Sequence, residues 1–310
     1  MTSCGKKIDL SVRLPGFVMK NPVIAASGAF GFGREYGDYV RLGDLGGVSV
    51  KALTLEPRRG NPPPRAAETA SGMLNAVGLQ NPGVRAFVRD ELPYLKSFAG
   101  LCVIANVAGA TADEYRECVR ILSDSPVDAI ELNVSCPNVR EGGMSFGAAE
   151  HTLYETVSYV RPACGKPLIV KLTPNVTDIR PLAKAAEAAG ADAVSLINTL
   201  LGMKIDIHTR RPVLANNTGG LSGPAIMPVA VRMTWEAAGA VGIPVIGMGG
   251  IASGDDAIEF MLAGASAVMV GTANFVEPDA CARITAGIYA YCEKYGFASP
   301  SEFTGKLSPW

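Results

Sequence analysis

The segment ELNVSCPN, residues 131–138, combines the end of an apolar strand with a cluster of polar residues around one cysteine. The mainly apolar run at 127–132, interrupted by Asp128 and Glu131, predicts a buried strand. Pro137 ends that strand, because proline lacks the N–H that a β-ladder needs. Cys136 is therefore expected at the strand's C-terminal tip, among asparagines that both donate and accept hydrogen bonds. The alternative is a buried, inert cysteine, but its polar neighbours would be costly to bury without a ligand.

Similar apolar runs recur along the whole chain. They are nearly continuous in Val, Ile, Leu, Ala and Met, as is typical of parallel strands covered on both faces. We expect eight strands, at Pro22–Ser27, Gly47–Leu53, Leu101–Val107, Ala129–Val134, Pro167–Leu172, Ala193–Asn198, Pro244–Gly247 and Ala267–Val270. Helix-like segments, such as 178–189, 224–240 and 254–263, separate most of them. This alternation predicts an α/β fold, the (β/α)8 TIM barrel, with a doubly wound open sheet as the alternative.

The remaining segments suggest how such a barrel is completed. Residues 8–20 alternate in polarity and predict a short N-terminal β-hairpin that closes the bottom of the barrel. The connections 54–81 and 200–223 contain no obvious element, and loops of that length are usually functional, so we expect long substrate-binding βα loops. No change in composition marks a boundary, and residues 1–310 are predicted to be a single barrel domain.

Composition limits the function classes. Hydrophobic residues make up 48% of the chain and the net charge is −1, which indicates a large core and gives no basic surface for nucleic acid. The N-terminus has no secretory apolar segment, and the most apolar stretch, 237–252, is too short to span a bilayer. No two of the seven cysteines are closer than eleven positions, which argues against a zinc or iron–sulfur site. We therefore expect a cytoplasmic protein that binds neither membrane, nucleic acid nor metal.

In a (β/α)8 barrel the residues that follow the strands build the active site. Here these positions are mainly polar or glycine, although the strands themselves are apolar. They are Ser27, Lys51, Asn106, Asn133 with Cys136, Lys171, Asn198 with Thr199, Gly249 with Gly250, and Gly271 with Thr272. Any one of them could be solvated or could cap a helix, but the whole set in register indicates one binding site.

Two glycine-rich turns in the last third of the chain, at 247–254 and 270–273, predict a phosphate site, because glycine lets backbone N–H groups approach an anion. The first also fits a dinucleotide fingerprint, but it lacks the acidic residue that would bind a ribose. Lys171 can stabilise a cofactor ring that becomes anionic on reduction; the alternative is a lysine that extends to solvent from the rim. A lysine, a phosphate site and a thiol together suggest hydride transfer coupled to proton abstraction.

Seven motifs resemble those of the class 1 dihydroorotate dehydrogenases, and together they cover nearly the whole chain. They are KALT at 51–54, GMLNAVGLQNPG at 72–83, NVSCPN at 133–138, IVKLTPN at 169–175, LINT at 196–199, GLSGPA at 220–225 and GMGGI at 247–251. The sequence NAVGLQNPG within the second motif is similar to the corresponding sequence of the class 1B catalytic subunit, which works with an NAD-linked partner. The fumarate-linked class 1A form typically differs there, and the class 2 enzymes use serine as base and carry a membrane extension.

The resemblance implies a role for each matching residue. Cys136 would be the base that removes a proton from the ring carbon next to the one that loses hydride. FMN, one per chain, would contact Ser27, Lys51, Ala52, Asn106, Asn133, Lys171, Ile197, Gly223, Gly249, Gly250, Gly271 and Thr272. Dihydroorotate would be bound by Lys51, Asn75, Ala76, Val77, Gly78, Leu79, Asn133, Asn138, Asn198 and Thr199. The loop 137–147 is expected to cover the substrate.

The resemblance also implies a partner. An electron-transfer subunit with FAD and a [2Fe-2S] cluster would relay electrons to NAD, in a heterotetramer of two catalytic and two electron-transfer chains. Three other readings remain open at this point. They are a transfer-RNA dihydrouridine synthase, which would need a basic surface; a dihydropyrimidine dehydrogenase, which has a similar cysteine motif; and a non-catalytic barrel that serves as a scaffold.

Overall fold

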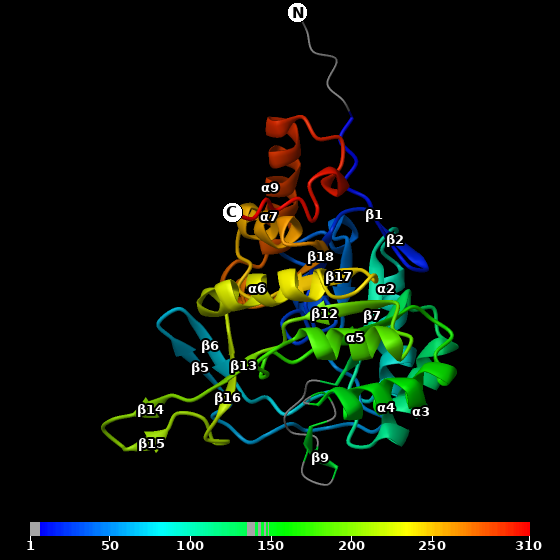
Figure 1. The fold of residues 1–310 in the computed structure, drawn as a ribbon. Helices are drawn as coiled ribbons and strands as arrows, with labels where there is room; N and C mark the ends of the chain where they lie inside the picture. Colours follow the sequence, from blue (N-terminus) through cyan, green and yellow to red (C-terminus); the bar gives the residue numbers. More distant parts are fainter. Residues whose placement is uncertain (1–6, 135–139, 142–143, 146, 148) are drawn as a thin grey trace, which may run out of the picture.

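Eight parallel strands form a closed barrel in the computed structural model, which describes residues 7–134, 140–141, 144–145, 147 and 149–310. The strands follow one another around the barrel in chain order (Figure 1). They are β3 (Val23–Ala25), β4 (Gly47–Ser49), β7 (Cys102–Val107), β8 (Ala129–Asn133), β11 (Leu168–Lys171), β12 (Ala193–Leu196), β17 (Val245–Met248) and β18 (Ala265–Val270). The predicted TIM barrel is confirmed, and the open-sheet alternative is wrong.

Helices cover the outside of the barrel. The main ones are α3 (Ala112–Ser123), α4 (Glu150–Val160), α5 (Arg180–Ala188), α6 (Met227–Ala238), α7 (Gly254–Leu262) and α9 (Ala280–Tyr295). Short helical turns at α1 (Val84–Ala86), 87–91, α2 (Leu92–Lys96) and α8 (Ala273–Val276) complete the layer. The three helices predicted from sequence are confirmed. Ser253 caps α7, because its hydroxyl accepts from Asp256 N while the Asp256 carboxylate accepts from Ser253 N.

The core has two parts because alternate residues of each strand point to opposite sides. Outward-facing residues such as Ile130 and Leu132 pack against the helices. Inward-facing residues such as Ile24, Ile104 and Ile169 fill the lower half of the barrel. The upper half, at the carboxyl ends of the strands, is left for polar side chains and glycine.

The predicted N-terminal hairpin is also confirmed, as β1 (Val12–Leu14) paired with β2 (Phe17–Met19). Its buried side chains, Leu14 and Met19, join the apolar cluster inside the barrel. Gly16 at the turn has a φ of +80°, and a Cβ there would lie 2.6 Å from Pro167 Cγ. The hairpin therefore closes the amino-terminal end of the barrel, as its alternating sequence suggested.

The two long connections differ from the sequence prediction, because they contain strands. β5 (Ala66–Thr69) and β6 (Gly72–Asn75) come from the first, and β13 (Leu200–Gly202) and β16 (Gly219–Ser222) come from the second. These four make one antiparallel sheet in the order β13-β16-β6-β5, and a ribbon of β14 (Ile205–Asp206) and β15 (Arg211–Pro212) extends beyond it. In Figure 1 this sheet and ribbon form an arm at the lower left of the barrel.

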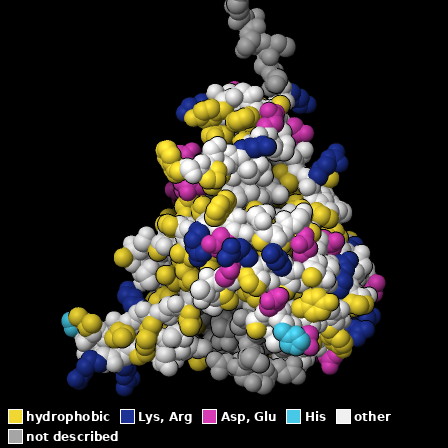
Figure 2. Space-filling view, viewed as in Figure 1, with side chains coloured by type: hydrophobic (Ala, Val, Ile, Leu, Met, Phe, Trp, Pro, Cys, Tyr) yellow, Lys and Arg dark blue, Asp and Glu magenta, His cyan; other side chains and the backbone are white. Residues whose placement is uncertain are grey.

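The arm carries exposed apolar side chains, visible as yellow atoms at the lower left of Figure 2. They include Leu201, Met203, Ile205 and Ile207, which are between 51% and 77% exposed.

None of the helices formed by the described residues has the length and apolar character needed to cross a bilayer.

Candidate active site

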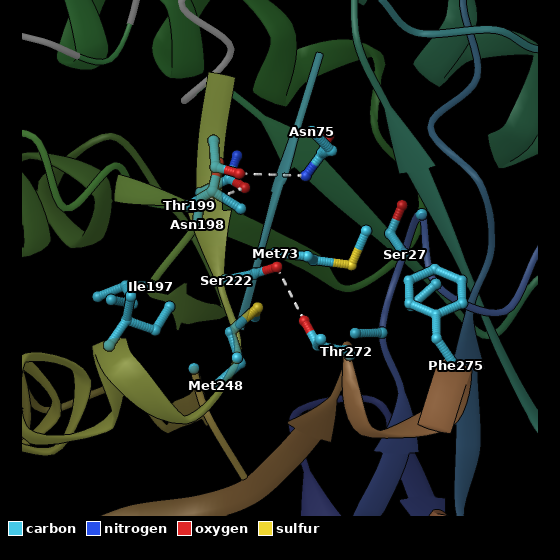
Figure 3. Close-up of a pocket in the computed structure, with 18 of the residues that line it drawn as sticks. Ser27, Met73, Asn75, Ile197, Asn198, Thr199, Ser222, Met248, Thr272 and Phe275 are labelled. Atoms are coloured by element: carbon cyan, nitrogen blue, oxygen red, sulfur yellow. Dashed lines mark hydrogen bonds between the residues drawn. The ribbon is translucent and has the colours of Figure 1, made fainter. Parts of the chain in front are cut away.

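A cavity of about 890 Å³ opens at the carboxyl ends of the barrel strands and is roofed by the arm sheet. Nearly all the predicted site residues meet there, although they come from segments far apart in the sequence. The lining includes Ser27, Lys51, Ala52, Asn75, Ala76, Val77, Gly78, Leu79, Asn133, Lys171, Ile197, Asn198, Thr199, Gly223, Gly249, Gly250, Gly271 and Thr272. Figure 3 shows Asn75, Asn198 and Thr199 on one side of the pocket and Thr272 and Phe275 on another.

Lys171 lies on the floor of this cavity. It is the last residue of β11, only 5% exposed, and its Cα pairs in register with Asn133 of β8. It forms no hydrogen bond or ion pair with any side chain in the described part of the chain, and it lines the cavity. The alternative of a lysine that extends to solvent is therefore wrong: the ammonium group is held within the barrel mouth.

Asn106 is placed differently from the prediction. It does not line the cavity but lies fully buried inside the barrel, where its Nδ2 donates to Glu131 Oε2 at 2.5 Å. Its Oδ1 has no hydrogen-bond partner among the described residues. A buried amide oxygen without a donor is costly. Because Asn106 does not line the cavity, its contact with the cofactor stays a prediction.

Three glycine turns, at Gly223, Gly249–Gly250 and Gly271, meet at one end of the cavity. Gly249 and Gly250 follow β17 with φ of +131° and +84°, and a Cβ on Gly250 would lie 2.7 Å from Met227 Cβ at the start of α6. Gly223 has a φ of +98° and precedes that helix. These turns can bring backbone N–H groups and the amino end of α6 to an anion, as predicted for the phosphate site.

A hydrogen bond that the sequence did not suggest joins the arm to this phosphate end. Thr272 Oγ1 donates to Ser222 Oγ at 2.8 Å, and both residues line the cavity (Figure 3). Ser222 is the last residue of β16, so its position depends on the arm sheet that sequence reasoning missed. The bond ties the roof of the cavity to its glycine-rich end.

The predicted substrate loop, 75–79, runs from the end of β6 along the cavity and is anchored by Asn81 just beyond it. Asn81 Nδ2 donates to Leu79 O at 2.7 Å and to Thr54 Oγ1 at 2.8 Å. Its Oδ1 accepts from Gly83 N at 2.8 Å and Thr54 N at 3.2 Å. Leu79 has a φ of +58°, a conformation unusual for leucine, so the anchoring carbonyl bond fixes a strained turn in the loop.

Asn198 and Thr199 form the opposite wall. The Asn198 amide lies near Asn133, with Nδ2 3.4 Å from Asn133 Oδ1. Asn175, which also lines the cavity, donates to Thr199 O at 3.1 Å and accepts from Leu201 N at 2.9 Å. It therefore holds the wall in place. The IVKLTPN motif includes this residue, but its spacing gave no sign of a positioning role.

Cys136 and Asn138, the predicted base and a predicted substrate ligand, lie outside the described residues, as does most of the loop 137–147. The described cysteines, 102, 118, 164, 281 and 292, are all buried. Burial raises the pKa of the Cys118 and Cys281 thiols to about 12 and raises that of Cys102 further. These thiols are therefore protonated at neutral pH and unsuited to act as bases.

Comparison with known proteins finds the family that the sequence motifs resemble. A family model of dihydroorotate dehydrogenases matches residues 9–291. The chain belongs to the dihydroorotate dehydrogenase family. A relative from Alkaliphilus metalliredigens is 55% identical over 97% of this chain and 99% of its own length. One from Geobacillus kaustophilus is 53% identical over 96% and 95%, and one from Caldicellulosiruptor bescii is 54% identical over 97% and 100%.

All three relatives are named "Dihydroorotate dehydrogenase B (NAD(+)), catalytic subunit". Membership in the dihydroorotate dehydrogenase family favours the class 1 resemblance over a transfer-RNA dihydrouridine synthase, a dihydropyrimidine dehydrogenase or a scaffold barrel. The identity covers the arm as well as the barrel, so the roof over the cavity belongs to the matched region.

Proposed function

We propose that this chain is the catalytic subunit of an NAD-linked dihydroorotate dehydrogenase, which oxidises dihydroorotate to orotate in pyrimidine biosynthesis. The observation that carries the proposal is the cavity at the carboxyl end of a family-matched barrel, lined by lysines, asparagines and glycine turns. Residues 1–310 act as one FMN-binding barrel domain.

The residues fit FMN. The cavity volume is within the range of cofactor sites, and the turns at Gly223, Gly249–Gly250 and Gly271 form a cradle for a phosphate. Asn106 is a proposed contact from the family resemblance alone. Ser27, Ala52, Asn133, Ile197 and Thr272 complete the proposed cofactor contacts. When bound, FMN supplies the two-electron acceptor for the hydride that leaves the substrate.

The chain's own residues bind and orient dihydroorotate. A carboxylate and a cyclic imide need a cation and several amide partners, which Lys51, Asn75, Asn133 and Asn198 supply around one cavity. The loop 76–79, Thr199 and Asn138 complete the proposed substrate contacts. Cys136 takes the proton from the ring carbon next to the one that loses hydride, so that one C–H bond on each carbon breaks and the ring double bond forms.

Electrons pass from this subunit to a second one. The partner carries FAD and a [2Fe-2S] cluster, and the assembly contains two catalytic and two electron-transfer chains. Phe275 and Val276, 55% and 78% exposed, line the mouth of the cavity and provide an apolar contact surface beside the cofactor. The isolated chain is expected to reduce an artificial dye but not NAD. Robust NAD reduction by the isolated chain would contradict the partner requirement.

The substrate assignment is tested by comparing dihydroorotate with dihydrouracil, which has the same ring without the carboxylate. We expect rapid reduction of the bound flavin by dihydroorotate only, because Lys51 and the asparagines recognise the carboxylate. Equal rates would assign the cavity to uncarboxylated dihydropyrimidines instead. Lys51→Met should narrow the difference between the rates at which dihydroorotate and dihydrouracil reduce the flavin.

A further inference from the structure

A buried asparagine, Asn274, lies directly behind the glycine turn that follows β18. It is the second residue of α8 and is only 1% exposed. The residues around it, Thr272, Ala273 and Phe275, line the cavity, whereas Asn274 does not. Its side chain is therefore directed into the protein, where an amide is costly to bury unless its groups are paired.

The Asn274 amide is paired at both of its polar atoms. Its Nδ2 donates to Val270 O, the last carbonyl of β18, at 2.8 Å, and its Oδ1 accepts from Cys281 Sγ of α9 at 3.4 Å. Burial raises the pKa of the Cys281 thiol to about 12, so the thiol keeps the proton that it donates. The backbone N–H of Asn274 donates to Gly271 O at 3.0 Å. Asn274 thus closes the turn with two hydrogen bonds, and α9 holds the amide in the orientation that this requires.

The same network reaches the turn that follows β3. Val270 O also accepts from Ala26 N at 2.8 Å, and Ala26 lines the cavity. The hydroxyl of Tyr36, a residue only 9% exposed, donates to Ala29 O at 2.8 Å and lies 3.4 Å from Asn274 O. The turns after β3 and β18, which come from opposite ends of the chain, are therefore fixed to each other behind the cavity.

The turn that Asn274 closes has hydrogen-bond donors to offer. Among the described residues, none accepts a hydrogen bond from the backbone N–H of Gly271 or Thr272. Both residues line the cavity, beside the glycine turns at Gly223 and Gly249–Gly250. Backbone N–H groups are rarely left without an acceptor, and successive unpaired ones in a glycine turn are typical of phosphate sites.

We propose that Asn274 is a positioning residue that keeps the Gly271–Thr272 turn in the shape that binds the flavin phosphate, with Tyr36 as its support. The inference rests on the proposed function, because it takes the cavity to hold FMN. A phosphate group needs several N–H donors directed at one point, and the two bonds from Asn274 set the direction in which this turn presents them. Loss of the amide should therefore weaken the binding of the phosphate and leave the binding of the flavin ring unchanged.

The test uses riboflavin, which has the ring and ribityl chain of FMN without the phosphate. Both dissociation constants are measured by fluorescence titration of flavin-free full-length protein, and the ratio of riboflavin to FMN reports what the phosphate contributes. The parental protein should prefer FMN strongly. Asn274→Ala should reduce this ratio by roughly tenfold, the effect of weakening one hydrogen bond to a charged group, and Tyr36→Phe should reduce it by roughly threefold.

Asn21→Ala is the matched control. Asn21 is 4% exposed and lies at the opposite end of the barrel, where its amide donates to Asp44 O at 3.0 Å and accepts from Val23 N at 3.1 Å. Its removal should lower the melting temperature about as much as Asn274→Ala does, while the ratio of dissociation constants stays parental.

An unchanged ratio in Asn274→Ala, or an equal loss in Asn21→Ala, would overturn the inference. Parental protein that binds FMN and riboflavin equally well would overturn it too, because the turn would then contribute nothing to phosphate binding. If Asn274→Ala does not fold, as judged by circular dichroism, an unchanged ratio in Tyr36→Phe overturns it. Parental protein that binds neither flavin would instead refute the proposed function.

Discussion

Removal of the Asn81 side chain should loosen the substrate loop while leaving the flavin site intact. Asn81 is 7% exposed and makes four hydrogen bonds, three of them to backbone groups of Thr54, Leu79 and Gly83. At a net contribution of about 0.5–1.5 kcal/mol each, the four sum to roughly 2–6 kcal/mol. Water that enters the space left by the side chain satisfies some of the freed groups, so we expect Asn81→Ala to cost about 3 kcal/mol.

For a chain of this size such a loss should lower the melting temperature by roughly 6 °C. Because Leu79 also loses the bond that fixes its turn, the KM for dihydroorotate should rise about tenfold while the dissociation constant of FMN stays unchanged. Gln80→Ala is the matched control: its exposed side chain accepts from Arg65, and its stability effect should be within about 0.5 kcal/mol. An Asn81→Ala protein with parental melting temperature and KM would refute this role.

Three further predictions concern the cofactor end and the base. Cys136→Ala should retain FMN but slow flavin reduction by roughly 100- to 10,000-fold in stopped-flow measurements, whereas a parental rate would make this cysteine structural. Lys171→Met should lower the flavin reduction potential by roughly 30–90 mV in a dye-equilibration titration, because the reduced ring loses a nearby cation; no change would place the lysine away from the ring. Gly250→Ala should cost about 2–3 kcal/mol in denaturant unfolding, from its φ of +84° and a 2.7 Å contact with Met227. Gly271→Ala, whose Cβ would meet Ala26 alone among the described residues, at 3.8 Å, should unfold like the parental protein. Equal effects of the two substitutions would contradict the steric argument.

Much of the fold follows from the sequence because a parallel barrel is built from local units. Each strand is a short apolar run, and residues at its carboxyl end are expected at the mouth of the barrel. Lys171 and Asn133 could therefore be placed without knowing any contact between them. The N-terminal hairpin was predictable for the same reason, since its alternation is a local signal.

The arm could not be predicted in this way. Its strands pair across long separations, as when Gly220 of β16 lies opposite Asn75 of β6. β16 reads GGLS and β5 reads AAET, and neither has the apolar run that marks a barrel strand. These strands are stabilised by partners that only the closed barrel brings together. Ser222 was missed as a site residue for that reason.

Glu131 shows a second limit. It stands within the most informative motif, yet the apolar run around it indicated only a buried strand. Its three donors, on Ser49, Asn106 and Ser195, come from strands 82, 25 and 64 residues away, so no spacing in the sequence reveals them. Asn106 was placed on the cavity wall because it lies near the end of its strand, but its amide is bonded to Glu131 inside the barrel.

Whether the cavity holds FMN and the protein oxidises dihydroorotate can be read from the absorbance spectrum of the purified protein without oxygen. We expect a yellow protein with one FMN per chain whose visible absorbance is bleached on addition of dihydroorotate, with no NAD or partner present. If the protein contains FMN but keeps its visible absorbance after dihydroorotate is added, it is not a dihydroorotate dehydrogenase.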